Sequence, residues 1–382
     1  MSSPIRPLHV GKFIPPPFAG MEAHLDTLLR AISGQADSTL VASEPARRGS
    51  PSAESNGKYR VLPIRSYATV ASVPFSPGVL SVAKEELRSG RSNLLHVHAP
   101  NPWGDLAVIA SSADTPVVMT WHSDIVRQQT LLKFYGSVQQ KALRRADRII
   151  VFTPRHYESS RQLRVGNLEN KVVAIPIGID FERLDLVQPD LRQLALLKQW
   201  AAGRPIVLSV GRHVYYKGYH HLLRAVAKMR SDAVLLMIGA GPLGAELIKH
   251  TVELGISQRV KFLGEVDEPT LAAALGLCDV FCLPSIEQSE AFGIASAEAM
   301  AYGKPTVVCE LHNGVNYLNQ AGVTSLVTQP RDEQELAGAL DQLVRDDALR
   351  ARMGSAARAW VRSEFGVEAM RDGTLALYRD LL

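Results

Sequence analysis

Short apolar runs alternate with longer amphipathic segments along almost the whole chain. In its first half, the runs expected to form strands are residues 6–13, 38–43, 59–64, 94–99, 116–121, 148–153 and 171–177. Several of them are continuously apolar, which is typical of strands buried in a parallel sheet. The pattern repeats from residue 205 to residue 329, with helical stretches between most of the strands. The alternation predicts an α/β protein with two doubly wound domains.

The repeat lapses between Ile179 and Trp200, where FERLDLVQPDLRQLALLKQW shows no strand pattern. This segment is expected to join the domains, which we place at residues 1–178 and 179–365. A chain of 382 residues is long enough for both, because single cores stop growing near roughly 250–300 residues.

The sequence EAFGIASAEAMAYGKP, which begins at Glu290, contains a predicted helix whose start is bare of bulky side chains. The helix should begin near Phe292 or Gly293. It should end where Gly303 can adopt a left-handed conformation, because Pro305 forbids its continuation. Glu290 therefore precedes the helix.

Glu298 lies inside that helix, roughly 7 Å below the first free amides, about the distance from a diphosphate to its ribose. A lone helix glutamate is more often a solvated surface residue. Here the segment lies between predicted buried strands at 280–285 and 305–310. Ligands of open α/β sheets bind where the carboxyl end of a strand leads into a helix. Both glutamates are therefore expected to face a crevice.

The segment GRHVYYKG supplies two cations, Arg212 and Lys217, directly after the predicted strand PIVLSVG. Two solvated surface cations are the alternative interpretation. Their position at a strand's carboxyl end favours binding of an anion. An Arg fork and a Lys point charge can neutralise a diphosphate and hold it as it departs.

The segment GAGPLG, residues 239–244, supports a different class of function. It fits the dinucleotide fingerprint, follows a predicted strand and opens a helix, and Glu265 lies about twenty residues further on. A nicotinamide-dependent oxidoreductase is therefore an alternative. Against it, the motif belongs to the second unit of its domain, and such an enzyme gives no role to Arg212, Lys217 and the two glutamates together.

In the first half, GKFIPPPFAG and TWHSD follow predicted strands. The glycines of the former could bring backbone amides to a phosphate. His122 ends a strand, although a lone histidine beside a tryptophan is more often packed or capping. His24 and His98 are weaker candidates, and Asp124 could orient His122 or cap the following helix.

These segments together resemble one family. EAFGIASAE, with two glutamates separated by seven residues, is similar to the signature of retaining nucleotide-sugar glycosyltransferases of the GT-B type, family four. GRHVYYKG, GAGPLG, VKFLGEV, PIGID and TWHSD also have counterparts in it, so the resemblance covers nearly the whole chain. It implies two Rossmann-like domains facing a central cleft, with residues 366–382 crossing back to the first. In this family GAGPLG is a packing turn.

The resemblance implies roles for particular residues. The catalytic set is Glu290, Arg212, Lys217 and His122, and the substrate-binding set is Gly20, Glu265, Val266, Phe292, Gly293, Ile294 and Glu298. Arg212 and Lys217 would bind the diphosphate, Glu298 the ribose, and Glu290 with His122 the donor sugar. The amides at the helix start would bind diphosphate and sugar hydroxyls, and the backbone near Glu265 the base. Where the family shows two adjacent glycines, this chain has Ala19 before Gly20.

The expected reaction transfers a hexose from a nucleotide diphosphate sugar to an acceptor hydroxyl with retention. GRHVYYKG and WHSDI resemble bacterial members that use GDP-mannose or a GDP-deoxyhexose in surface polysaccharide (lipopolysaccharide) assembly, which suggests a glycan acceptor carried on a lipid. A GT-B epimerase and a non-catalytic sugar-binding module remain alternatives. The chain has no Asp-x-Asp triplet, so we expect no metal and no cofactor, and we assign no nucleophile.

Composition is that of an ordinary globular protein, with 46% hydrophobic and 21% charged residues. No apolar run approaches the ~18 residues of a membrane span, and the N-terminus lacks a secretory signal. We therefore expect a cytoplasmic enzyme. Cys278, Cys282 and Cys309 are interpreted as small core residues, because their spacing matches no metal or redox pair.

Positive charge is concentrated in the first half. Residues 1–180 hold half of the 42 Lys and Arg but only 14 of the 38 Asp and Glu. The densest basic part is KALRRADR, residues 141–148, in a helix expected to begin near Thr130. It is either a solvated helix face or a surface for anionic lipid on the inner face of the cell membrane. We expect no nucleic-acid partner.

Overall fold

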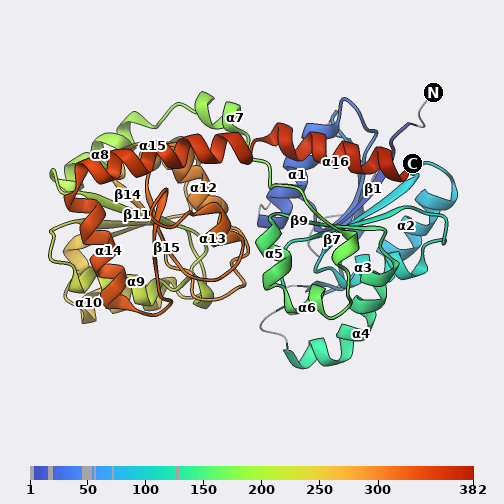
Figure 1. Cartoon of the computed structure of the whole chain (residues 1–382), viewed down its shortest axis with the longest axis horizontal. Coiled ribbons are helices and arrows are strands. Elements are labelled where there is room, and N and C mark those ends of the chain that lie inside the picture. The colour runs from blue at the N-terminus through green and yellow to red at the C-terminus, as the bar shows by residue number, and fades with distance from the viewer. Residues whose placement is uncertain (1–3, 16–19, 45–53, 56, 71–72, 126–128) are drawn as a thin grey trace. The chain divides into compact units, whose positions relative to one another are not determined.

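The computed structural model describes residues 4–15, 20–44, 54–55, 57–70, 73–125 and 129–382. The chain divides into two compact units (Figure 1). The first comprises residues 1–179 and 365–382, and the second comprises residues 180–364. The first unit is thus assembled from two separate stretches of the sequence.

The main sheet of the first unit has the strand order β10-β9-β8-β7-β1-β2-β4-β3. Its parallel strands are β1 (Pro7–Phe13), β2 (Thr39–Glu44), β4 (Arg60–Arg65), β7 (Leu94–Ala99), β8 (Val117–Trp121), β9 (Arg148–Val151) and β10 (Val172–Ala174). The short β3 (Glu54–Ser55) pairs antiparallel with β4. In a separate two-stranded sheet, β5 (Thr69–Val70) pairs antiparallel with β6 (Val73–Pro74). The parallel order confirms the predicted α/β class.

Helices cover both faces of this sheet. They are α1 (Gly20–Ile32), α2 (Gly78–Arg88), α3 (Pro102–Ala110), α4 (Gln129–Arg145), α5 (Pro154–Ser159), α6 (Arg161–Arg164), η1 (Glu169–Lys171) and α16 (Val367–Leu381). The last of them packs beside α1 on one face, where Met370, Leu375 and Tyr378 join Leu28 and Ile32 in a common core. The apolar positions of α16 recur at helical spacing, which explains why it buries a face there.

The sheet of the second unit has the order β13-β12-β11-β14-β15-β16, all parallel. The strands are β11 (Ile206–Val210), β12 (Val234–Ile238), β13 (Val260–Gly264), β14 (Val280–Leu283), β15 (Thr306–Cys309) and β16 (Ser325–Thr328). The first strand of the unit, β11, pairs with both β12 and β14. The strand order therefore reverses between β11 and β14, and doubly wound sheets bind ligands at the carboxyl ends of such a pair.

The helices of the second unit are α7 (Phe181–Leu186), α8 (Leu191–Ala201), η2 (Tyr215–Lys217), α9 (Tyr219–Lys228), α10 (Gly244–Glu253), η3 (Ser257–Arg259), α11 (Glu268–Leu277), α12 (Ile294–Ala301), α13 (Gly314–Leu318), α14 (Glu333–Arg345) and α15 (Asp347–Glu364). Separate apolar clusters fill the space on the two sheet faces. The three cysteines are buried and free, as predicted. Burial raises the pKa of the Cys309 thiol to about 11, which keeps it protonated.

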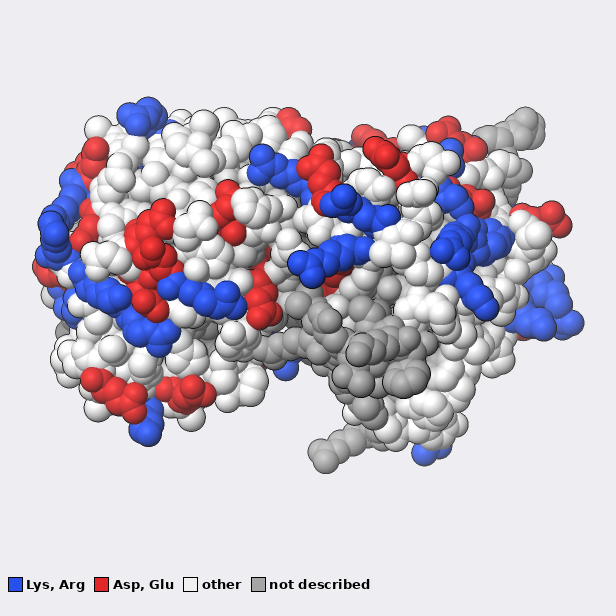
Figure 2. Space-filling model, turned by 60° about the horizontal axis from the view of Figure 1, so that its bottom comes forward, with Lys and Arg blue, Asp and Glu red and all other residues white. Residues whose placement is uncertain are grey.

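No helix in the described residues combines the length and apolarity needed to cross a bilayer. In the basic segment that ends α4, Arg145 donates to the carbonyl oxygens of Ser112 and Thr115. Lys171 donates to the carbonyl oxygens of Arg144 and Ala146. Part of the local positive charge therefore holds loops of the unit in place. Over the second unit, Figure 2 shows basic and acidic side chains interspersed.

Candidate functional site

Lys217 and Glu290 meet where the strand order of the second unit reverses. Lys217 ends η2, after β11, and Glu290 lies in the loop after β14. The Lys217 Nζ is 2.5 Å from the Glu290 Oε2, and the two side chains are only 12% and 11% exposed. Burial by itself would lower the pKa of Lys217, but the Glu290 carboxylate opposes it and the net shift is upward. The site therefore holds a charged pair in a nearly closed position.

Neighbouring residues fix the Glu290 carboxylate and its loop. The Ser285 hydroxyl donates to the Glu290 Oε2 at 2.9 Å. The Asn313 side-chain amide donates to the Glu290 carbonyl oxygen at 2.7 Å, while its own oxygen accepts from the Val315 amide and caps α13. Neither residue was predicted from the sequence. Ser285 stands directly after the strand end, and Asn313 precedes a glycine at a helix start, so an N-cap pattern was the available signal.

The loops after β11 and β14 pack backbone against backbone. The Ile286 amide donates to the Tyr216 carbonyl oxygen at 2.8 Å. Gly218 has φ +69°, and a Cβ there would lie 2.0 Å from the carbonyl oxygen of Pro284. Only glycine permits this approach, which brings Lys217 to Glu290.

Gly218→Ala should destabilise the protein by several kcal/mol, because left-handed strain of about 1–2 kcal/mol adds to an overpacking cost of about 1–3 kcal/mol. Gly255→Ala is the matched control. Gly255 has φ +68°, but nothing lies within 4 Å of its Cβ position, so its cost should be the strain alone. Urea unfolding of both variants measures the difference. Equal losses would contradict the steric role of Gly218.

The start of α12 is open in the way the sequence predicted. Gly293 is the N-cap residue, with φ 86° and no side-chain capping bond. The first helical bonds run from the amides of Ser296 and Ala297 to the Gly293 carbonyl oxygen, so the amides of Ile294 and Ala295 precede them. At the other end Gly303 has φ +71°, which confirms the predicted helix end. Such a helix start attracts an anion through its amides and dipole.

Glu298 lies within α12 and is half-buried. Burial, followed by the nearby Glu268 carboxylate, raises the pKa of Glu298 to about 7, although Arg183 opposes the shift. Arg183 and Glu268 form an ion pair with each other. Glu298 therefore has acidic and basic neighbours different from those of Glu290.

The remaining predicted residues of the second unit lie at the same carboxyl edge of the sheet. Arg212 is exposed in the loop after β11, Phe292 is buried before α12, and Glu265 and Val266 follow β13 as exposed and half-buried residues. Of these predicted residues, Lys217 and Glu290 form an ion pair with each other.

The glycines of GAGPLG accommodate neighbouring backbone. A Cβ at Gly239 would lie 2.2 Å from the Gly211 carbonyl oxygen, and one at Gly241 would lie 2.5 Å from the His213 carbonyl oxygen. The Leu243 amide donates to that same His213 oxygen, and the Gly239 amide donates to Gly264. These amides are bonded within the protein, so the turn serves close packing and offers little to a dinucleotide phosphate.

In the first unit, Gly20 opens α1 and is exposed, while Ala19 lies outside the described residues. His122 follows β8 and is buried, and His98 and His24 approach it. Asp124 does not orient His122. It accepts from the Ser160 hydroxyl and the Arg161 amide at the start of α6 and from the Trp121 indole. Asp124 therefore accepts hydrogen bonds at the start of α6, whereas the residues that lead into the following helix, 126–128, lie outside the described residues.

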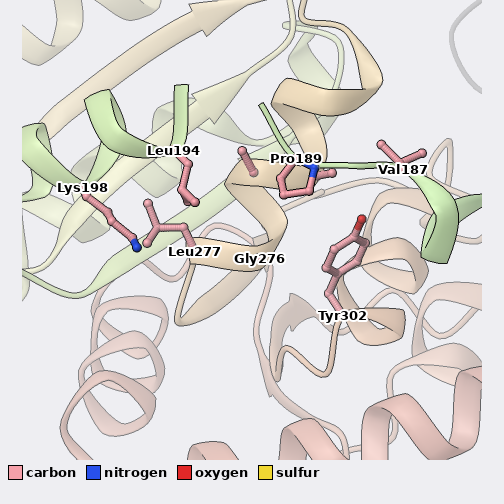
Figure 3. A pocket seen from close by; sticks show the side chains of 9 residues that line it. Val187, Pro189, Leu194, Lys198, Gly276, Leu277 and Tyr302 are labelled. Atoms are coloured by element: carbon pink, nitrogen blue, oxygen red, sulfur yellow. The ribbon is translucent and has the colours of Figure 1, made fainter. Parts of the chain in front are cut away.

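A pocket of about 360 Å³ lies between α8, α11 and Tyr302 (Figure 3). Leu194 and Leu277 line it, with Lys198 nearby. None of the predicted site residues is among its lining residues.

Two family descriptions match the chain. They are "Glycosyltransferase Family 4" over residues 18–183 and "Glycosyl transferases group 1" over residues 197–360. The O-antigen chain mannosyltransferase C of Escherichia coli is 31% identical over 380 residues, which cover 99% of each chain. The D-rhamnosyltransferase WbpZ of Pseudomonas aeruginosa is 34% identical over 296 residues, 78% of this chain and 75% of that protein.

Solved structures share the fold. Sucrose-phosphate synthase from Thermosynechococcus elongatus aligns with a TM-score of 0.82 at 22% identity and covers 99% of both chains. HepE of Anabaena, in complex with UDP, aligns with a TM-score of 0.77 at 20% identity, over 98% of this chain and 100% of that one. The likeness extends over both α/β units.

Proposed function

The chain belongs to glycosyltransferase family four, with the GT-B fold, and from that premise we propose that it transfers a hexose from a nucleotide diphosphate sugar to a glycan hydroxyl with retention. GDP-mannose or a GDP-deoxyhexose is the proposed donor, because the relatives include a mannosyltransferase and a D-rhamnosyltransferase. The proposed acceptor is a lipid-linked glycan of a surface polysaccharide. The contact between Lys217 and Glu290 at the strand reversal is the observation that carries the proposal.

The chemistry requires stabilisation of a departing diphosphate more than a strong base. Lys217 is paired with Glu290, so the pair has little net charge, but its ammonium would still donate hydrogen bonds to the departing diphosphate. Arg212 and the amides at the start of α12 supply the remaining attraction for the diphosphate. Glu290 is held by Lys217 and Ser285 and would accept hydrogen bonds from the donor sugar. Glu298 would accept them from the ribose.

We expect the reaction to need no divalent cation. The chain has no Asp-x-Asp triplet for a bridging metal, and the groups proposed for the diphosphate are cations and amides. Product formation should therefore be unchanged, within about twofold, after dialysis against EDTA. A loss that added Mg²⁺ or Mn²⁺ restores would contradict this expectation.

The function is tested by thermal unfolding with a panel of GDP and UDP sugars and with NADH and NADPH. The true donor at a hundred times its Kd should stabilise the protein by about 2.7 kcal/mol. Incubation with a glycan acceptor should then release nucleoside diphosphate and form a glycoside of unchanged anomeric configuration. Stabilisation by a nicotinamide cofactor alone would overturn the proposal. A rearranged nucleotide sugar without a glycoside would favour an epimerase, and binding without turnover would favour a sugar-binding module.

A further inference from the structure

Six buried polar side chains form a linear series of hydrogen bonds, here called the file, across one face of the first unit's sheet. In order they are Thr120, His96, Tyr378, His9, His98 and His122. The bonds measure 2.7 Å, 2.5 Å, 3.4 Å, 3.2 Å and 3.2 Å in that order. The neighbouring strands β1, β7 and β8 supply His9, His96, His98 and Thr120, His122 directly follows β8, and α16 supplies the tyrosine. The proposed reaction assigns a role only to the last member.

The rings of the file are neutral near pH 7. Burial, with a contribution from His24, lowers the pKa of His9 to about 3. Burial also lowers the pKa of His96, His98 and His122 well below its usual value. Each ring therefore carries one proton, with one nitrogen that donates and one that accepts.

The direction of one bond consequently fixes all the others. Within the described residues, the Thr120 hydroxyl makes its hydrogen bond to His96 Nε2 alone. If His96 donated there, the buried hydroxyl proton would lose its acceptor, which is costly. Thr120 therefore donates, and His96 Nδ1 donates to Tyr378. Tyr378 then donates to His9, His9 Nδ1 donates to His98, and His98 Nδ1 donates to His122 Nε2.

We propose that this file holds His122 as the tautomer protonated on Nδ1, so that His122 is a hydrogen-bond donor to the substrate and not a base. Its Nε2 lone pair is occupied by His98 and is unable to take a proton from the acceptor hydroxyl. Thr120, His96, Tyr378, His9 and His98 are positioning residues. The tautomer follows from the hydrogen bonds themselves, whereas its role toward substrate rests on the proposed function.

Some of the same nitrogens could instead bind a metal. His24, His98 and His122 offer ligand atoms within 4.8 Å of one another, as do His9, His96 and His98. A metal ion between His98 and His122 would replace the proton that they share. Both ring nitrogens of His96 already bond hydroxyl groups, those of Tyr378 and Thr120, so we favour protons.

The tautomer is measured by long-range proton–nitrogen NMR on protein with ¹⁵N-labelled histidine and no substrate. The His122 signals, assigned with His122→Asn, should show protonated Nδ1 and unprotonated Nε2. Tyr378→Phe removes the link between His96 and His9, so His122 should become a mixture of both tautomers. His213→Gln is the control, because His213 is a buried histidine of the second unit and lies outside the file, and it should leave the signals unchanged.

Protonated Nε2 in the unmodified protein would overturn the proposal, even if the tyrosine variant failed to fold. One equivalent of tightly bound zinc, removed by His98→Asn, would overturn it in favour of a metal site.

A second measurement concerns the role of His122 toward the substrate. His122→Asn keeps a donor near the Nδ1 position and should retain activity within about tenfold, while His122→Ala should lose about a hundredfold in kcat. If both variants lost kcat equally while His122 showed the expected tautomer, the role of His122 as a donor to the substrate would be refuted. The direction of the hydrogen bonds along the file would still hold.

Discussion

Replacing Lys217 with methionine should lower kcat by about 10²–10³-fold, because the departing diphosphate loses a preorganised cation. Folding should also be weakened, since Glu290 would keep its charge in a nearly closed site. Breaking a buried pair costs about 3–5 kcal/mol, and the Ser285 hydrogen bond should reduce that cost. The measurements are steady-state kinetics and urea unfolding.

Two further variants separate catalysis from stability. Lys217→Met combined with Glu290→Gln removes both charges, so it should recover stability without recovering activity. Lys228→Met is the control, because Lys228 also pairs with a glutamate, Glu333, but is 43% exposed. Its effect on kcat should stay within about twofold. If Lys217→Met kept normal turnover once refolded, Lys217 would be a structural residue only.

Glu298→Gln should raise thermal stability while weakening donor binding. Burial, then Glu268, raises the folded pKa of Glu298 to about 7, above its usual value of 4.5. The protonated form therefore stabilises the folded state. This contribution to the free energy of unfolding is complete below pH 4.5 and is lost as pH rises through 7. The variant should unfold at a higher temperature than the unmodified protein at pH 8 and at nearly the same temperature at pH 5.

Donor binding should follow the opposite trend. A carboxylate accepts ribose hydroxyl bonds better than a carboxylic acid, so affinity of the unmodified protein should rise as pH increases through 7. The glutamine variant should lose this dependence and bind about 10-fold more weakly at pH 8. Glu268→Gln should move the midpoint to lower pH, since it removes the repelling charge. Calorimetric titration of the donor at several pH values measures both. A midpoint unaffected by Glu268→Gln would show that the assignment to Glu298 is wrong.

Local features of the sequence predicted the glutamate-bearing helix well. Gly303 and Pro305 marked its end because they restrict the backbone, and the structure places the left-handed glycine there. The direct pairing of Lys217 with Glu290 could not be predicted from the sequence. It depends on β11 and β14 being neighbours in the sheet, which the alternation of strands and helices does not specify.

The histidine file shows the same limitation. His122 by itself is more often a packed or capping residue, and nothing local connects it with His9 or with Tyr378. Those contacts depend on strand register and on the docking of α16. The expectation that Asp124 orients His122 failed for the same reason, because its partner Ser160 is distant in sequence.

The placement of α16 has a consequence for biosynthesis. Its residues complete the core beside α1, yet they follow the entire second unit in the sequence. Domains generally fold as they leave the ribosome, N-terminal part first. Here the first unit must wait with an uncovered apolar face until α16 is translated, so a chaperone has an opportunity to bind it in that interval.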